Sequence, residues 1–521
     1  MSLSPPVATV PEPLRVATSR GRWVLLATVL GSSVAALDAT VVGIALPAIG
    51  RDFRVGLASL QWVVTAYLLT LAGLLLVGGS LGDRFGRRRV FVVGVAWFAA
   101  ASLLCGIAPS AAVLVAARAL QGVGGALLTP GSLAILEASF APADRARAIG
   151  AWSGLGGVAT ALGPFLGGWL IDAVSWRLVF FINLPLAAAV VVVAVRHVPE
   201  SRDPQATGGV DVPGGLLAAL GLGGLTYGLI EGPGRGFASP VVLGSLAVGV
   251  AALALLLLVE SRVRAPMLPL SIFRSRQFGA ANAVTFTVYA ALGGALFLLP
   301  LELQTVAGYS PFAAGTALLP VTLLMLALSA RSGALAARIG PKLQMTTGPL
   351  VVAAGMALLV RIDTAGAYLT QVLPAVTVLG LGLAITVAPL TSTVLAAAPA
   401  EHAGVSSAVN NDVARAASLL AVALLPAAAG ISGASYLDPA GFDVGFGRAV
   451  LLAAALCAAG GVLAAATIRN PPRGRHGRGE EEPGPRRPAD LHPATCTRPT
   501  CTARSTRLPC AAVATTGGNG P

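Results

Sequence analysis

Two oppositely charged residues, Asp38 and Arg118, lie inside long apolar segments of this chain of 521 residues. Ionisable residues are costly inside a lipid bilayer and usually serve a function there. At the rise of an α-helix, Arg118 is about 9 Å and Asp38 about 13 Å from the same end of the predicted spans, so an ion pair between them is possible. An acid that gains and loses a proton beside a fixed cation can act as a proton switch, and a pair that serves packing alone is the alternative.

Other polar residues in the apolar segments are candidates to line a substrate cavity. Asp412 and Arg415 are three residues apart, which allows them to pair along one face of a helix. Glu302 and Gln304 end an apolar segment, so we expect them near the membrane surface instead. A cavity that contains Asp38 would favour cationic compounds. The cavity candidates are Thr40, Gln121, Asn410, Asn411, Asp412 and Arg415.

Residues 78–91 read GGSLGDRFGRRRVF and join two apolar segments through a very short connection. The arginines fit a tight loop on the basic side of a membrane protein, whereas the acid Asp83 does not. A helix N-terminus attracts an anion, so we expect Asp83 to form a conformational latch with the helix that begins near Gly404. The latch candidates are Gly82, Asp83, Arg84, Gly86, Arg87 and Arg88.

The segment 150–168 is rich in glycine and is interrupted by Pro164. Proline removes a helical hydrogen bond and kinks the helix, while glycine lets neighbouring helices approach closely. The segment therefore predicts a hinge for movement between two access states, with close packing as the alternative. The hinge candidates are Gly163, Pro164, Gly167 and Gly168.

Motifs for several other chemistries are missing or lie in the wrong context. The single lysine, Lys342, is not part of a nucleotide-binding loop, so we expect no ATP-driven pumping by that motif. Residues 78–82 match the hydrolase pattern G-x-S-x-G by letter, but they end a helical segment and follow no strand. The four histidines form no H-E-x-x-H motif and the five cysteines form no C-x-x-C pair, so we expect neither an enzyme nor a metal site.

The composition is that of an integral membrane protein, with 55% apolar residues, 11% charged residues and a mean hydropathy of +0.80. A membrane-spanning helix needs roughly 20 apolar residues, and the continuous apolar runs argue against a β-barrel, whose strands alternate. We predict an all-α fold with fourteen spans, at about 23–47, 60–81, 89–108, 112–137, 147–171, 177–197, 212–232, 239–260, 279–302, 313–333, 343–361, 367–390, 403–431 and 447–468.

The basic residues indicate how these spans are oriented. Of the 35 basic residues, 27 fall on the side of the N-terminus and 6 on the opposite side. Basic residues accumulate in cytoplasmic loops, so we expect both termini in the cytoplasm and the protein in the inner or plasma membrane, surrounded by lipid. This placement accounts for the net charge of +13 without a nucleic-acid partner.

The two halves of the sequence repeat at an offset of about 254 residues, since LGDRFG from Leu81 matches LAARIG from Leu335. A parallel repeat places a substrate cavity between two bundles, here of six helices each. We predict a cytoplasmic N-terminus over 1–22, an N-terminal bundle over 23–197, a linker with two inserted spans over 198–278, a C-terminal bundle over 279–468 and a disordered, basic cytoplasmic tail over 469–521.

Together these motifs resemble the major facilitator superfamily, in particular its fourteen-span drug:proton antiporters. Gly43 stands where that family usually has an asparagine. The resemblance covers about 23–468 and rests on LDATVVGIALP from Leu37, GSLGDRFGRRR from Gly79, Arg118 to Gly125, residues 159–168 and SWRLVFFINLP from Ser175. It implies that Asp38 and Arg118 take part in proton coupling, that Asp83 stabilises one access state and that Gly163 and Pro164 mark a kink.

We therefore expect a proton-coupled efflux transporter that exports apolar or amphipathic small molecules by alternating access. The proton is the expected coupling ion, and no other cofactor is expected. Two alternatives stay open: a uniporter or symporter that imports a small nutrient, and a membrane sensor that transports nothing. Loss of a compound from energised cells would indicate efflux, and its accumulation would indicate import.

Overall fold

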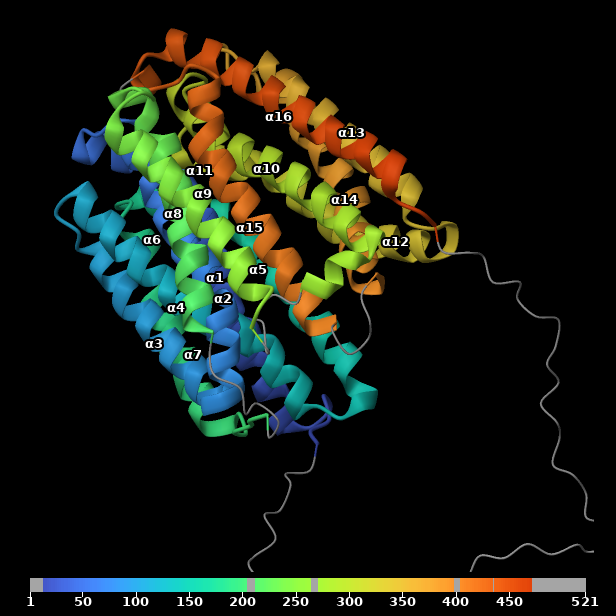
Figure 1. Cartoon of the computed structure of the whole chain (residues 1–521). Helices are drawn as coiled ribbons and strands as arrows, with labels where there is room; N and C mark the ends of the chain where they lie inside the picture. The colour runs from blue at the N-terminus through green and yellow to red at the C-terminus, as the bar shows by residue number, and fades with distance from the viewer. Residues whose placement is uncertain (1–12, 204–210, 264–269, 398–402, 434, 471–521) are drawn as a thin grey trace, which may run out of the picture. The chain divides into compact units, whose positions relative to one another are not determined.

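The computed structural model describes residues 13–203, 211–263, 270–397, 403–433 and 435–470, and Figure 1 shows how the helices are arranged. Fourteen helices in these ranges are long and apolar enough to span a membrane, which confirms the predicted all-α fold and the number of spans. The start of the predicted cytoplasmic N-terminus and the tail after residue 470 lie outside the described residues.

The amino-terminal half contains six of these spans, the last of which consists of two consecutive helices. Its helices are α1 (Ser19–Phe53), α2 (Leu57–Phe85), α3 (Arg87–Gly106), α4 (Ala111–Ser139), α5 (Pro142–Ala173), α6 (Leu178–Phe181) and α7 (Asn183–His197). Helix α4 packs against α2 and α3, while α1 packs against α5 and α7. These contacts make one bundle.

The carboxyl-terminal half contains another six spans, in which α10 packs against α15 and α16, and α14 packs against α12 and α13. Its helices are η1 (Leu270–Arg274), α10 (Arg276–Thr305), α11 (Pro311–Ala317), α12 (Leu319–Ile339), α13 (Lys342–Leu358), η2 (Leu359–Arg361), η3 (Tyr368–Val372), α14 (Leu373–Ala396), α15 (Ala403–Ala428), η5 (Ser435–Leu437) and α16 (Pro439–Thr467).

Two further helices, α8 (Val212–Arg235) and α9 (Pro240–Glu260), come between the halves in the sequence. They pack against each other, and α8 also contacts α2 of the first half and α15 of the second (Figure 1). The inserted pair therefore touches both bundles through α8.

The connection between the second and third spans has the same geometry in both halves. Gly86 and Gly340 adopt positive φ angles of 113° and 89°, a conformation that favours glycine. Glu200 and Asn470 each follow the last span of their half, and each accepts a hydrogen bond from the backbone N–H two residues after that glycine, at 3.0 and 2.9 Å. The repeat seen in the sequence is thus also a repeat of tertiary contacts.

The two halves meet around the end of α1 and the start of α2, and we call this the closed end. Gln304 of α10 donates a hydrogen bond to the carbonyl oxygen of Ile44 at 3.0 Å. The backbone N–H of Leu57 donates to the carbonyl oxygen of Gly433 at 2.8 Å. A continuous apolar core here combines residues of both halves, and α5 packs against α11.

We call the opposite end of the helices the open end. Here the first half of α5 has no close neighbours at several positions. A side chain added at the α-carbon of any of four glycines there would meet no atom within 4 Å; these are Gly150, Gly154, Gly156 and Gly157. Close contact between the halves is therefore concentrated at the closed end.

The segment before α1 pairs with the connection between α4 and α5. The backbone N–H of Leu14 donates to the carbonyl oxygen of Ser139 at 2.8 Å, and that of Ala141 donates to the carbonyl oxygen of Leu14 at 3.0 Å. The N–H of Val16 donates to a carboxylate oxygen of Asp144 at 3.0 Å. This segment tethers the start of α1 to the start of α5.

Candidate functional site

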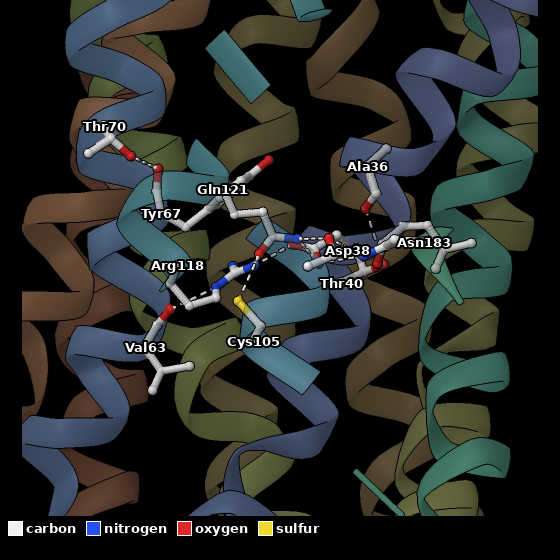
Figure 2. Close-up of polar contacts among 12 residues, drawn as sticks. Ala36, Asp38, Thr40, Val63, Tyr67, Thr70, Cys105, Arg118, Gln121 and Asn183 are labelled. Carbon is white, nitrogen blue, oxygen red and sulfur yellow. Dashed lines mark hydrogen bonds and ion pairs between the residues drawn. The ribbon is translucent and has the colours of Figure 1, made fainter. Parts of the chain in front are cut away.

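The structure brings Asp38 of α1 and Arg118 of α4 into contact inside the amino-terminal bundle (Figure 2). Nη1 of Arg118 lies 2.5 Å from Oδ2 of Asp38, and the two residues are 1% and 0% exposed. Nε of Arg118 also donates to the carbonyl oxygen of Val63 on α2 at 3.1 Å. The ion pair expected from the sequence is therefore formed, and its part in proton coupling stays a prediction.

Two amides hold the other carboxylate oxygen of Asp38. Gln121 of α4 donates to Oδ1 at 2.8 Å, and Asn183 of α7 donates to the same oxygen at 3.0 Å. Both amides also donate to the hydroxyl of Ser102 on α3, at 2.7 and 3.3 Å. Because four helices contribute to this network, protonation of Asp38 would alter contacts throughout the bundle.

Asn183 is a site residue that the sequence analysis did not identify. Its signal is an amide at the start of the last apolar segment of the first half, within INLP. A side chain at Gly43, where the related family usually has asparagine, would meet no atom within 4 Å. The amides that donate to Asp38 come from α4 and α7, and none comes from position 43.

A cavity of about 300 Å³ lies between α10, α14 and α15, with Leu68 of α2 at its edge. Three predicted cavity residues, Asn410, Asn411 and Arg415, line it, together with polar groups such as Tyr289. Asp38 is sealed in the bundle and does not line this cavity, so the expected preference for cations has no support there.

The other three cavity candidates lie elsewhere in the structure. Gln121 is fully buried in the Asp38 network. The hydroxyl of Thr40 donates to carbonyl oxygens of its own helix, at 3.0 Å for Leu37. Asp412 forms no ion pair within 4 Å with Arg415 in the described part of the chain, and its Oδ1 has no hydrogen-bond partner there, so their pairing stays a prediction.

Tyr67 of α2 connects the buried ion pair with the cavity. The guanidinium carbon of Arg118 lies 4.4 Å from the centre of the Tyr67 ring, and the tyrosine is 2% exposed. The next residue of α2, Leu68, lines the cavity. Helix α2 therefore contacts the buried ion pair at Tyr67 and the cavity at Leu68.

The short connection between α2 and α3 holds its charges by local pairs. Asp83 pairs with Arg87 one helical turn later, at 2.8 Å. Glu200, which the sequence analysis did not identify, lies 3.7 Å from Nε of Arg88 and accepts a hydrogen bond from the backbone N–H of Arg88. Arg84 lies over the ring of Phe85, and a side chain at Gly82 would meet no atom within 4 Å.

The predicted latch joins Asp83 to the helix that begins near Gly404. Residues 398–402, which precede that helix, lie outside the described residues, so the latch stays a prediction.

The hinge candidates on α5 make close helix contacts at two different places. A side chain at Gly163 would clash with Thr40, and one at Gly167 would clash with Val41, both on α1 of the same bundle. A side chain at Gly168 would instead meet the α-carbon of Phe312 at 2.7 Å, in the other half. Gly163 and Gly167 thus pack α5 inside its bundle, whereas Gly168 packs it across the closed end.

Pro164 lies within α5 and faces the second half as well. A side chain at Gly315 of α11 would clash with the backbone carbonyl of Pro164. The rings of Phe165 and Phe312 lie next to each other, with centroids 5.2 Å apart. The predicted kink therefore lies where the two halves touch.

Glu302 lies in the last turn of α10, at the end of its span, but it is buried in the protein. It is 0% exposed, and neither of its carboxylate oxygens has a hydrogen-bond partner among the described residues. The sequence did not predict this burial, which arises because α10 continues to Thr305 and the closed end covers this last turn.

Comparison with protein families finds a match to a model described as the Major Facilitator Superfamily, over residues 28–423. A tetracenomycin C resistance and export protein of Streptomyces glaucescens is 39% identical over 78% of this chain and 76% of its own. A methylenomycin A resistance protein of Bacillus subtilis is 37% identical, over 78% and 87%. A puromycin resistance protein of Streptomyces alboniger is 37% identical, over 84% and 88%.

Solved structures share the fold at low sequence identity. An inward-facing, unoccupied bacterial homologue of the human lysosomal transporter Spinster has a TM-score of 0.61 and 16% identity, covering 87% of this chain and 98% of that chain. A POT family transporter in complex with a peptide conjugate has a TM-score of 0.63 and 12% identity, covering 86% and 96%.

Proposed function

The chain belongs to the major facilitator superfamily, as its motifs suggested, and from this premise we propose that it exports antibiotic-like amphipathic molecules in exchange for protons. The similar proteins named for resistance and export support the direction of transport and the class of cargo. On this proposal the chain is a transporter and not an enzyme. It lies in the plasma membrane with both termini in the cytoplasm, and it uses the proton as its coupling ion.

The observation that carries the proposal is the sealed contact between Asp38 and Arg118. When Asp38 is ionised, it balances the cation on Arg118. When Asp38 takes up a proton, that cation loses its counter-ion in a low-dielectric interior, where interactions between charges are strong. The unbalanced charge then acts on α2, whose Tyr67 lies against Arg118 and whose Leu68 lines the cavity.

Alternating access follows if the closed end faces the outside, as the placement of basic residues predicts. The structure then has the cavity on the path to the cytoplasm. Cargo enters from the cytoplasm either after Asp38 has released its proton or as Asp38 releases it. Opening of the closed end delivers the cargo outside and exposes the interior to the more acidic side, which reloads Asp38.

Transport by purified protein in liposomes tests this function. An imposed pH gradient, acidic inside, is expected to drive uptake of at least one of tetracenomycin C, methylenomycin A and puromycin into vesicles that hold the protein with its cytoplasmic face outward. A protonophore together with a potassium ionophore removes both gradient and voltage and should stop the uptake. Undiminished uptake after this treatment would contradict proton exchange, and movement only in the opposite direction would favour import.

Arg415 gives the cavity wall a positive charge, and none of the lining residues is acidic. We therefore expect the cavity to favour neutral or anionic molecules. Arg415→Gln should weaken binding of an anionic aromatic probe such as fluorescein by about tenfold, which corresponds to about 1.4 kcal/mol. Fluorescence titration of the purified protein measures this change.

Two controls accompany the Arg415 variant. Arg415→Lys keeps the charge and should retain most of the affinity, while Arg331→Gln removes an exposed arginine on α12 and should change nothing. A similar loss of affinity for the cation ethidium would show that Arg415 shapes the cavity without selecting charge.

A further inference from the structure

Glu302 is a buried acid that the proposed exchange at Asp38 does not use. The residue is 0% exposed, and neither carboxylate oxygen accepts a hydrogen bond from a described residue. Burying an ionised carboxylate without partners costs many kcal/mol, so such a group is carried as the neutral acid. Asp38 differs, because three side chains donate to it.

The charged group that acts on Glu302 from the elements around it is another acid, Asp443 of α16. Asp443 is half-buried on α16, which packs against α10. No ion pair joins Glu302 to a basic residue in the described ranges. Two adjoining carboxyl groups without a cation cannot both be ionised at little cost, and they share one proton.

This pair of acids lies at the closed end. Two residues after Glu302, the side chain of Gln304 donates to the carbonyl oxygen of Ile44 on α1 at 3.0 Å. The last turn of α10 therefore contacts α16 through Glu302 and the other half of the protein through Gln304. Opening of the closed end would separate α10 from α1 and admit water to this turn.

We propose that Glu302 and Asp443 form a second proton-binding site, separate from Asp38 and located in the carboxyl-terminal bundle. The proton is bound by Glu302, whose carboxyl group donates a hydrogen bond to the carboxylate of Asp443. The site releases or takes up its proton when the closed end opens to water, and it must hold the proton for that end to close. Its part in transport rests on the proposed function, whereas its proton binding does not.

Infrared spectroscopy of the purified protein in lipid at neutral pH tests proton binding without any cargo. The wild-type protein should show the C=O band of a protonated carboxylic acid that is missing from Glu302→Gln. Asp443→Asn should shift this band, because the hydrogen-bond acceptor changes from a carboxylate to an amide. Glu137→Gln, which alters an exposed acid on α4, should leave the band in place.

One infrared result would contradict the proposed proton-binding site. If the difference between wild type and Glu302→Gln contained only bands of ionised carboxylate, Glu302 would not hold a proton. Because the glutamine side chain resembles a neutral glutamic acid in shape, we expect Glu302→Gln to fold; Asp443→Asn provides an independent reading if it does not.

Proton counting in liposomes tests the role in transport. Glu302→Gln should lower by about one the number of protons moved per molecule of whichever of the three antibiotics the wild type transports, with downhill efflux of that antibiotic kept. An unchanged ratio beside a lost infrared band would show that the bound proton is structural. Absence of transport in the wild type would contradict the proposed function and leave the infrared result on the site standing.

Discussion

Asp38→Asn is expected to reduce proton-driven export to the background of empty liposomes. An amide cannot gain or lose a proton in this pH range, so the exchange step is removed. The variant also leaves Arg118 buried without a counter-ion, which should lower the free energy of unfolding by about 3–5 kcal/mol. Transport in liposomes under an imposed pH gradient and thermal unfolding in detergent measure the two effects separately.

A double variant distinguishes lost coupling from lost stability. Asp38→Asn combined with Arg118→Gln removes both charges and should regain most of the stability, because no buried charge is left unpaired. It should still fail to export against a gradient. Wild-type export by Asp38→Asn alone would remove this acid from the mechanism.

Gly168→Leu is expected to hold the closed end open and to reduce transport at least tenfold. A side chain at this position would lie 2.7 Å from the α-carbon of Phe312, so the two halves could not approach as they do. Overpacking of this kind costs about 1–3 kcal/mol. A cost of that size shifts the balance between two access states by roughly 5- to 150-fold.

A reporter cysteine shows whether the closed end has opened. Ala314 of α11 is 0% exposed in this contact, so Ala314→Cys, in a background with all native cysteines replaced by serine, should react with an impermeant maleimide only after opening. Labelling is expected to rise in Gly168→Leu. Gly154→Leu is the matched control on the same helix, because a side chain there meets no atom within 4 Å. Equal protection and full transport in both variants would contradict a gating role for Gly168.

The sequence predicted those features that follow from a single residue type in its local context, such as a charged residue in an apolar segment or a glycine in a short turn. A lone acid and a lone arginine inside apolar runs predicted the pair of Asp38 and Arg118, which the structure forms. A glycine between two adjacent spans predicted the tight turn at Gly86, where φ is positive. The repeat of the two halves could also be predicted, because similar motifs recur at a constant offset along the chain.

Contacts between distant helices were harder to predict. Asn183 lies 145 residues after the acid that it binds, and helix periodicity does not report which helices become neighbours. The burial of Glu302 was not predicted, because an exposed helix end and a covered helix end look alike in sequence. The spacing of Asp412 and Arg415 allows them to pair, but spacing does not report that Arg415 lines a cavity between three helices.

The pairing of Leu14 with Ser139 and Ala141 has a consequence for the order of assembly during translation. The ribosome releases the chain from its amino-terminal end, so Val16 is made 128 residues before its acceptor Asp144. Four membrane helices must be synthesised in that interval before this segment can dock. Its docking therefore marks a late step in the biogenesis of the first bundle, and a nascent chain stalled before residue 144 would leave α1 without this anchor.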